Sequence, residues 1–171
     1  MPEQTKGTNM LKITTAPVNA VAATGVFTIT NTVSDGETVT IGSRVYEFKT
    51  SGDATLGNIK VDISGGATNA LSATALITAI GTTDPLVTAT TGGTGIVDVT
   101  ARVKGVIGNT IVSIADLANG SWGDDTLAAG VDGTVVGSAG LWFIDGSYAY
   151  VTTDANTATD ANWRKITHAS L

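Results

Sequence analysis

The chain has 171 residues, no cysteine, and a formal net charge of −6 from nine basic and fifteen acidic residues. The lack of cysteine excludes disulfides, thiolate metal sites and cysteine nucleophiles, and the lack of a basic cluster argues against direct binding to nucleic acid. Only 14% of the residues are charged, against about 25% in an average protein. This composition favours a β-domain whose surface is partly covered by partners or by copies of itself, although a threonine-rich monomer would have the same profile.

The first segment, residues 1–21, mixes Thr, Asn, Lys and Pro around one short apolar run that contains Met10, Leu11 and Ile13. Such a segment buries too little to order itself alone. It is either a frayed terminus or an arm that pairs with a neighbouring subunit by strand addition. It lacks the basic-then-apolar order of a signal peptide, and no stretch approaches about 18 consecutive apolar residues. We therefore expect a protein that is made, and stays soluble, in a cytoplasm.

Alternating apolar residues predict a strand over residues 25–31, with Phe27 and Ile29 on one face. The strongest local signal follows at residues 38–49, where two alternating arms flank Gly42 and Ser43. A glycine followed by a small polar residue suits the two-residue turn of a β-hairpin. The positions that this hairpin offers to a core are Val39, Ile41, Tyr46 and Phe48.

A strand with one solvent-exposed face is predicted over residues 58–64, and a helix is predicted over residues 68–80. Thr68 or Asn69 can cap the start of the helix, and Gly81 is a natural stop. The apolar helix positions at i, i+3, i+4 and i+7 are Ala73, Leu76, Ile77 and Ile80.

A turn is predicted at Asp84-Pro85, and a second hairpin is predicted from residues 86–91 and 96–102, which flank a glycine-rich turn. Residues 110–114 are predicted as the last strand of this β-rich body. We expect residues 119–133 to have little regular structure and to hold their shape by packing, with two anchors, Trp122 and Leu127.

The composition shifts at about residue 135, and residues 121–171 hold all three tryptophans. Three short strands are predicted at residues 141–144, 148–152 and 163–167, which would form a small aromatic β-module. The whole sequence thus predicts a mainly β fold with one short helix. Its predicted parts are an extended arm over residues 1–21, a β-sandwich or barrel-like body over residues 22–134, and a three-stranded module over residues 135–171.

The residues that catalysis or metal binding would need are sparse. The single histidine, His168, lies three residues from the C-terminus, and a histidine-dependent triad therefore has no convincing base. The run that starts at Asp154 fails the calcium-loop pattern, because Thr159 and Lys165 replace its glycine and glutamate. The pair Asp124-Asp125 with Asp132 is a weaker metal candidate. We predict no catalytic residue, no metal and no cofactor.

Three stretches of the body resemble a module that recurs in structural proteins of tailed bacteriophages. They are Ser34-Asp35-Gly36-Glu37-Thr38-Val39-Thr40-Ile41-Gly42 through Tyr46-Glu47-Phe48-Lys49, Gly108-Asn109-Thr110-Ile111, and Ser121-Trp122-Gly123 with Leu127-Ala128-Ala129-Gly130-Val131-Asp132-Gly133. The chain's ending is similar to a second short module at the ends of phage virion proteins. It reads Gly140-Leu141-Trp142-Phe143-Ile144-Asp145, Tyr148-Ala149-Tyr150-Val151 and Asn162-Trp163-Arg164-Lys165-Ile166.

This resemblance implies a virion component, and the small size suggests a capsid decoration or head-fibre protein that binds the major capsid protein as a homo-oligomer, with a trimer favoured. Because aromatic and apolar side chains dominate interface energetics, the candidate contact residues are Met10, Leu11, Ile13, Trp142, Tyr148, Tyr150 and Trp163. For Trp142 and Trp163, a place in the module's own core is the stronger interpretation. The alternatives are a tail tube or baseplate building block, a carbohydrate-binding adhesin, and an enzyme built on a carboxylate pair.

Overall fold

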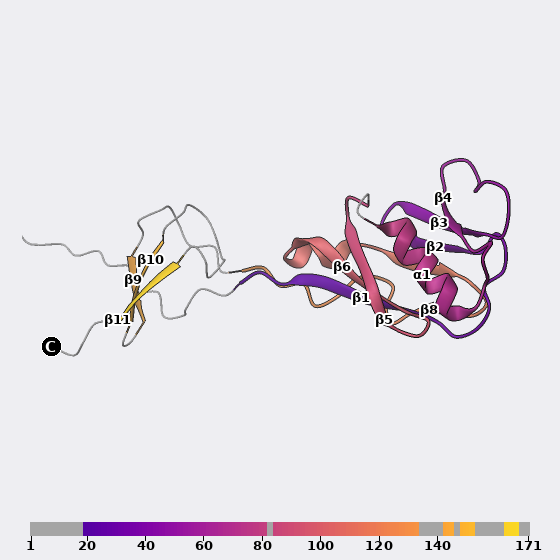
Figure 1. The fold of residues 1–171 in the computed structure, drawn as a ribbon. Coiled ribbons are helices and arrows are strands. Elements are labelled where there is room, and N and C mark those ends of the chain that lie inside the picture. The colour runs from indigo at the N-terminus through magenta and orange to yellow at the C-terminus, as the bar shows by residue number, and fades with distance from the viewer. Residues whose placement is uncertain (1–18, 82–83, 134–141, 146–147, 153–162, 168–171) are drawn as a thin grey trace, which may run out of the picture. The chain divides into compact units, whose positions relative to one another are not determined.

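The computed structural model describes residues 19–81 and 84–133, together with the backbone of three strands within residues 142–167. The chain divides into two compact units: Val21–Asp132, called the body below, and a second unit that combines Met1–Ala20 with Gly133–Leu171. Over the described residues, the fold is mainly β with one α-helix, as predicted (Figure 1).

Two four-stranded sheets form the framework of the body. The first has the order β4-β3-β2-β7, with β2 (Thr38–Ile41), β3 (Arg44–Lys49), β4 (Ile59–Asp62) and β7 (Ser113–Asp116). The second has the order β5-β6-β1-β8, with β1 (Ala22–Ile29), β5 (Val87–Gly93), β6 (Ile96–Lys104) and β8 (Gly120–Trp122). Neighbouring strands are antiparallel except β3 and β4, which are parallel.

The predicted central hairpin is confirmed: β2 and β3 pair directly across Gly42 and Ser43, with Ile41 opposite Arg44. Its four predicted core positions are fully buried, in one cluster with Phe27 and Ile29 of β1. The second predicted hairpin, β5 with β6, is also confirmed, although its strands run further and leave a tighter turn, since Gly93 pairs with Ile96.

The predicted helix is confirmed as α1 (Asn69–Ile80), which packs against strands of both sheets (Figure 1). The hydroxyl of Thr68 accepts a hydrogen bond from the amide of Leu71 at the helix start. The helix ends at Gly81, whose φ of 43° is easily adopted only by glycine. Leu76 and Ile80 are buried completely, and this face closes the core.

The strand predicted over residues 110–114 forms, but its bounds are shifted toward the C-terminus. A 3₁₀ helix, η1 (Val106–Thr110), occupies its start, and the strand β7 begins only at Ser113. A Cβ on Gly108 would lie 2.8 Å from the Cβ of Ala23 and 3.0 Å from that of Ala101, so only glycine lets η1 pack this closely on β1 and β6. This close packing between distant segments leaves no signal in the local alternation.

The strand β8 lies in a stretch predicted to have little regular structure. It pairs with β1, and its Trp122 ring lies 5.1 Å from the ring of Phe27 at 40°. Leu127 is fully buried, so both predicted anchors pack on the core. In the second unit, the three predicted strands form as β9 (Trp142–Asp145), β10 (Tyr148–Thr152) and β11 (Trp163–Thr167). They pair as an antiparallel sheet of order β11-β10-β9.

Candidate interaction surface

The most elaborate polar network among the described residues fixes the loop over residues 50–58, called the crossover loop below. This loop joins the parallel strands β3 and β4, so it must return along the sheet from the end of one strand to the start of the other. Side chains alternate along β3, which places Glu47 on the face opposite Tyr46 and Phe48. Glu47 is nevertheless only 5% exposed, because the crossover loop covers it.

The carboxylate of Glu47 fixes the far end of the crossover loop. Its Oε2 accepts a hydrogen bond from the amide of Thr55 at 2.8 Å and another from Nδ2 of Asn58 at 2.8 Å. The hydrogen bond from Asn58, followed by that from Thr55, lowers the pKa of Glu47. Oε1 lies 3.7 Å from Nζ of Lys49.

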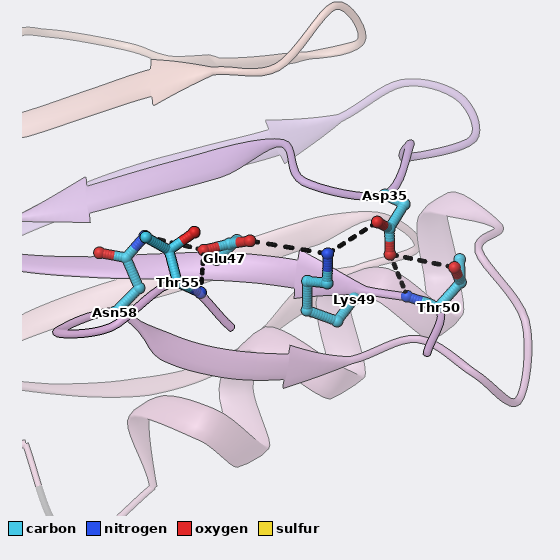
Figure 2. A network of polar contacts seen from close by, with 6 residues as sticks. All are labelled: Asp35, Glu47, Lys49, Thr50, Thr55 and Asn58. Atoms are coloured by element: carbon cyan, nitrogen blue, oxygen red, sulfur yellow. Dashed lines mark hydrogen bonds and ion pairs between the residues drawn. The ribbon is translucent and has the colours of Figure 1, made fainter. Parts of the chain in front are cut away.

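Asp35 fixes the near end of the loop. Its Oδ1 accepts hydrogen bonds from the amide and hydroxyl of Thr50 at 2.7 and 3.0 Å, and its Oδ2 accepts one from Nζ of Lys49 at 2.7 Å. Mainly through the Lys49 hydrogen bond, the pKa of Asp35 falls to about 2, and Asp35 in turn raises the pKa of Lys49. Figure 2 shows one continuous row of contacts from Asn58 to Thr50, with Lys49 bridging the two carboxylates.

The fixed loop presents one large apolar side chain, that of Leu56. The amide of Asn58 donates to the carbonyl of Thr55 at 2.9 Å, which closes a β-turn with Leu56 and Gly57 at its centre. Gly57 has a φ of 96°, the conformation that a type II turn requires at this position. Leu56 is 102% exposed. Leu56 is therefore held in solvent by a loop whose far end is fixed by Glu47 of β3 and whose near end is fixed by Asp35.

A second polar cluster surrounds Asp84, which is 1% exposed. Its Oδ2 accepts a hydrogen bond from the hydroxyl of Tyr46, and its Oδ1 accepts from the amides of Leu86 and Val87 at 2.7 and 3.0 Å. Burial, followed by the bond to Asp84, raises the pKa of Tyr46. Both carboxylate oxygens thus have partners that tie the start of β5 to the central hairpin. The sequence predicted only a turn at Asp84-Pro85.

The register of the second unit separates the predicted aromatic contact residues. Tyr150 stands opposite Phe143 and Lys165, and Trp163 stands opposite Thr152. Because directly opposed residues share a face of an antiparallel sheet, Tyr148, Tyr150 and Trp163 belong to one face, called the aromatic face below. Trp142 stands opposite Val151 and belongs to the other face. Met10, Leu11 and Ile13 lie outside the described residues.

The described carboxylates form no metal cluster: among these residues, no three His, Cys, Asp or Glu side chains are grouped closely enough to hold an ion. Asp132, a weak metal candidate in the sequence, accepts a hydrogen bond from the amide of Val106 at 2.9 Å and so caps η1. Within the described part of the chain, no helix has the length and apolar character needed to cross a membrane. No protein-family model, curated protein or solved structure matches this chain.

Proposed function

We propose that this chain is a non-enzymatic structural protein of a tailed-bacteriophage virion, a capsid decoration or head-fibre protein that binds the assembled major capsid lattice. The observation that carries the proposal is that three carboxylates of the body are occupied by contacts within the body itself. The oxygens of Asp35, Glu47 and Asp84 accept hydrogen bonds from backbone amides and from hydroxyls, or lie beside neighbouring cations. Asp35 and Glu47 hold the crossover loop in shape, and Asp84 holds the start of β5 on the core. A surface that is kept in shape in this way suits a protein that works by docking.

Docking on a repeating lattice favours a surface that is ordered before it binds. Association loses free energy when side chains and loops must be immobilised, and a loop that is already fixed avoids much of that loss. The many equivalent sites of a closed shell then add avidity without requiring a strong single contact. The network of the crossover loop and the sheet framework of the body both meet this requirement.

The proposed lattice contacts come from the arm, with Met10, Leu11 and Ile13, and from the aromatic face of the β9–β11 sheet. Tyr148 and Tyr150 are the proposed anchors of that face, because they stand two residues apart on the central strand β10. Tyrosine supplies a large rigid contact area at low entropic cost. Val151 lies on the same strand but belongs to the opposite face, and it provides a matched control.

The test uses phage heads assembled without this protein, to which the purified full chain is added before the heads are sedimented. We expect the chain to cosediment at a saturating, symmetric number of copies. Deletion of residues 1–20, which leaves Val21 and its pairing with Val131 in place, or the double substitution Tyr148→Ala with Tyr150→Ala should reduce occupancy at least tenfold, and Val151→Ala should leave it unchanged. Binding to tails in place of heads, spontaneous tubes, or no cosedimentation of the wild-type chain would overturn the proposal.

A further inference from the structure

We propose that Asn119 is a site of spontaneous deamidation and that the hydrogen bonds around it set the rate of the reaction. This proposal is independent of the proposed function, since it concerns the chemistry of the body alone. Asn119 is the one asparagine in the sequence that is followed by a glycine, Gly120. Deamidation is fastest in this dipeptide, because a residue without a Cβ leaves its backbone nitrogen open to approach.

The reaction consumes a water molecule and needs no enzyme. The backbone nitrogen of Gly120 attacks the side-chain carbonyl carbon of Asn119, and the new C–N bond closes a succinimide ring. The side-chain NH₂ group leaves as ammonia, with the proton of the Gly120 amide. Water then opens the ring at either of its carbonyl carbons, which gives an aspartate in the original backbone or an isoaspartate. Both products carry a carboxylate in place of the amide.

The core packing fixes the glycine of this dipeptide. Gly120 begins β8 and stands opposite Ile29 of β1. A Cβ at this position would lie 2.9 Å from Cζ of Phe27 and 3.0 Å from Cβ of Leu117. Any larger residue would push β8 away from β1, so the fold cannot replace the glycine without a loss of packing. The reactive dipeptide is therefore built into the junction of β7 and β8.

Hydrogen bonds to both its side chain and its backbone hold Asn119 in the folded body. Its Nδ2 donates to the carbonyl of Thr32 at 2.9 Å, and its backbone carbonyl accepts from the amide and the hydroxyl of Thr30 at 2.8 and 3.2 Å. Closing the succinimide ring rotates both the side chain and the backbone of Asn119. The reaction therefore has to wait until these bonds open, which makes the folded body the protected form.

Glu37 holds the turn that leads into this dipeptide. Its Oε1 accepts a hydrogen bond from the amide of Ala118 at 2.8 Å, and its Oε2 accepts one from the amide of Ser34 at 2.6 Å. The strand β8 itself has three residues and lies at the edge of its sheet, and short edge elements open locally at low free energy. We expect Glu37 to control this opening and hence the rate of deamidation.

Deamidation would in turn weaken the hold on β8. The carboxylate that replaces the amide cannot donate to the carbonyl of Thr32, so two acceptor oxygens then face each other. The new charge also lies one residue from Ala118, whose amide binds the Glu37 carboxylate, and like charges repel. The modified strand should therefore leave β1 more often, with its Trp122 ring, which packs on Phe27.

The first experiment follows the reaction itself. The full chain is incubated in mildly alkaline buffer, both folded and unfolded in urea, and each asparagine is monitored by peptide mapping with mass spectrometry. We expect product at Asn119 ahead of the other asparagines, and a faster reaction in urea than in the folded protein.

Variants of Glu37 test what sets the rate. Glu37→Ala should speed the reaction of the folded chain by about tenfold or more, the shift in an opening equilibrium that one charged hydrogen bond produces. Glu37→Gln, which keeps an acceptor oxygen, should give an intermediate rate. Asp62→Ala is the matched control and should leave the rate unchanged. The Asp62 carboxylate also accepts from a loop amide, that of Ser64, but it belongs to β4, at the edge of the other sheet.

The second experiment measures what the modification does to β8. Asn119→Asp reproduces one of the two products, and the readout is hydrogen exchange at the amide of Gly123, which donates to the carbonyl of Val26 on β1 at 3.3 Å. We expect faster exchange in this variant. Asn31→Asp adds the same charge beside Thr32 but should leave exchange unchanged, because the side-chain oxygen of Asn31 already acts as an acceptor for the amide of Thr32.

Circular dichroism confirms that each variant is folded, and if Glu37→Ala is not, the comparison of Glu37→Gln with Asp62→Ala decides. An Asn119 that stays unmodified in urea, equal rates in the folded and unfolded chain, Glu37 variants no faster than Asp62→Ala, or unchanged exchange in Asn119→Asp would each show that the proposal is wrong.

Discussion

Replacing Tyr46 with phenylalanine removes one hydroxyl from the core and leaves the ring in place. The ring is completely buried, and the hydroxyl donates to Oδ2 of Asp84, itself 1% exposed. A hydrogen bond to a charged group contributes about 1.5–3 kcal/mol. Asp84 keeps its bonds from Leu86 and Val87, and Nε of Arg44 remains 3.8 Å from Oδ2. We therefore expect Tyr46→Phe to lower the free energy of unfolding by about 2 kcal/mol, toward the middle of that range.

The assay is equilibrium urea unfolding of the full chain, followed by a signal from the body, with a double-mutant cycle that adds Asp84→Ala. Each substitution removes the bond between Tyr46 and Asp84, so their effects should be less than additive by more than about 1 kcal/mol. A Tyr46→Phe variant within about 0.5 kcal/mol of the wild type, the range of neutral surface changes, would refute the account of this cluster.

The pH dependence of the unfolding free energy provides an independent test of the contact between Tyr46 and Asp84. The folded state raises the pKa of Tyr46 above the usual value of tyrosine, which is about 10. The folded protein thus holds this proton more tightly than the unfolded chain, so the stabilisation is complete below about pH 10 and declines as the pH rises further. The stability difference between wild type and Tyr46→Phe should therefore shrink above that pH, and a constant difference would contradict the assignment.

Three further predictions concern the crossover loop and η1. Glu47→Ala should speed hydrogen exchange at the Thr55 amide, with partial recovery in Glu47→Gln; unchanged exchange would show that the carboxylate does not hold the loop. The Asp35 carboxyl should titrate near pH 2 by NMR and not near its usual 3.8, so its contribution to stability is present above pH 4 and lost as the pH falls toward 2; a midpoint near 4 would count against the contact with Lys49. Gly108→Ala should destabilise the body by about 1–3 kcal/mol through overpacking in urea unfolding, whereas a neutral effect would mean that η1 can move away from β1.

Local patterns predicted the elements whose causes are local. The β2–β3 hairpin follows from alternation around a two-residue turn, and α1 follows from its apolar spacing with Thr68 and Gly81 at its ends. The 3₁₀ helix and the late start of β7 could not be predicted in this way. They depend on how closely Gly108 approaches two other strands.

The polar networks were missed for the same reason. Alternation correctly assigned Tyr46 and Phe48 to the core, which leaves Glu47 on the opposite face, but alternation does not say what covers that face. Its burial depends on the parallel pairing of β3 with β4, which draws the crossover loop across it. Asp84 was predicted as a turn residue, yet its partner Tyr46 lies 38 residues earlier in the chain. The available signal was a glutamate between two aromatic core residues, Tyr46 and Phe48, because a charged residue that becomes buried needs a partner.

The most direct measurement is cryo-microscopy of purified phage particles whose protein content has been identified by mass spectrometry. We expect density for the body at regularly spaced positions on the head. Particles from which the chain is missing, or in which it is found only on the tail, would contradict the proposed function.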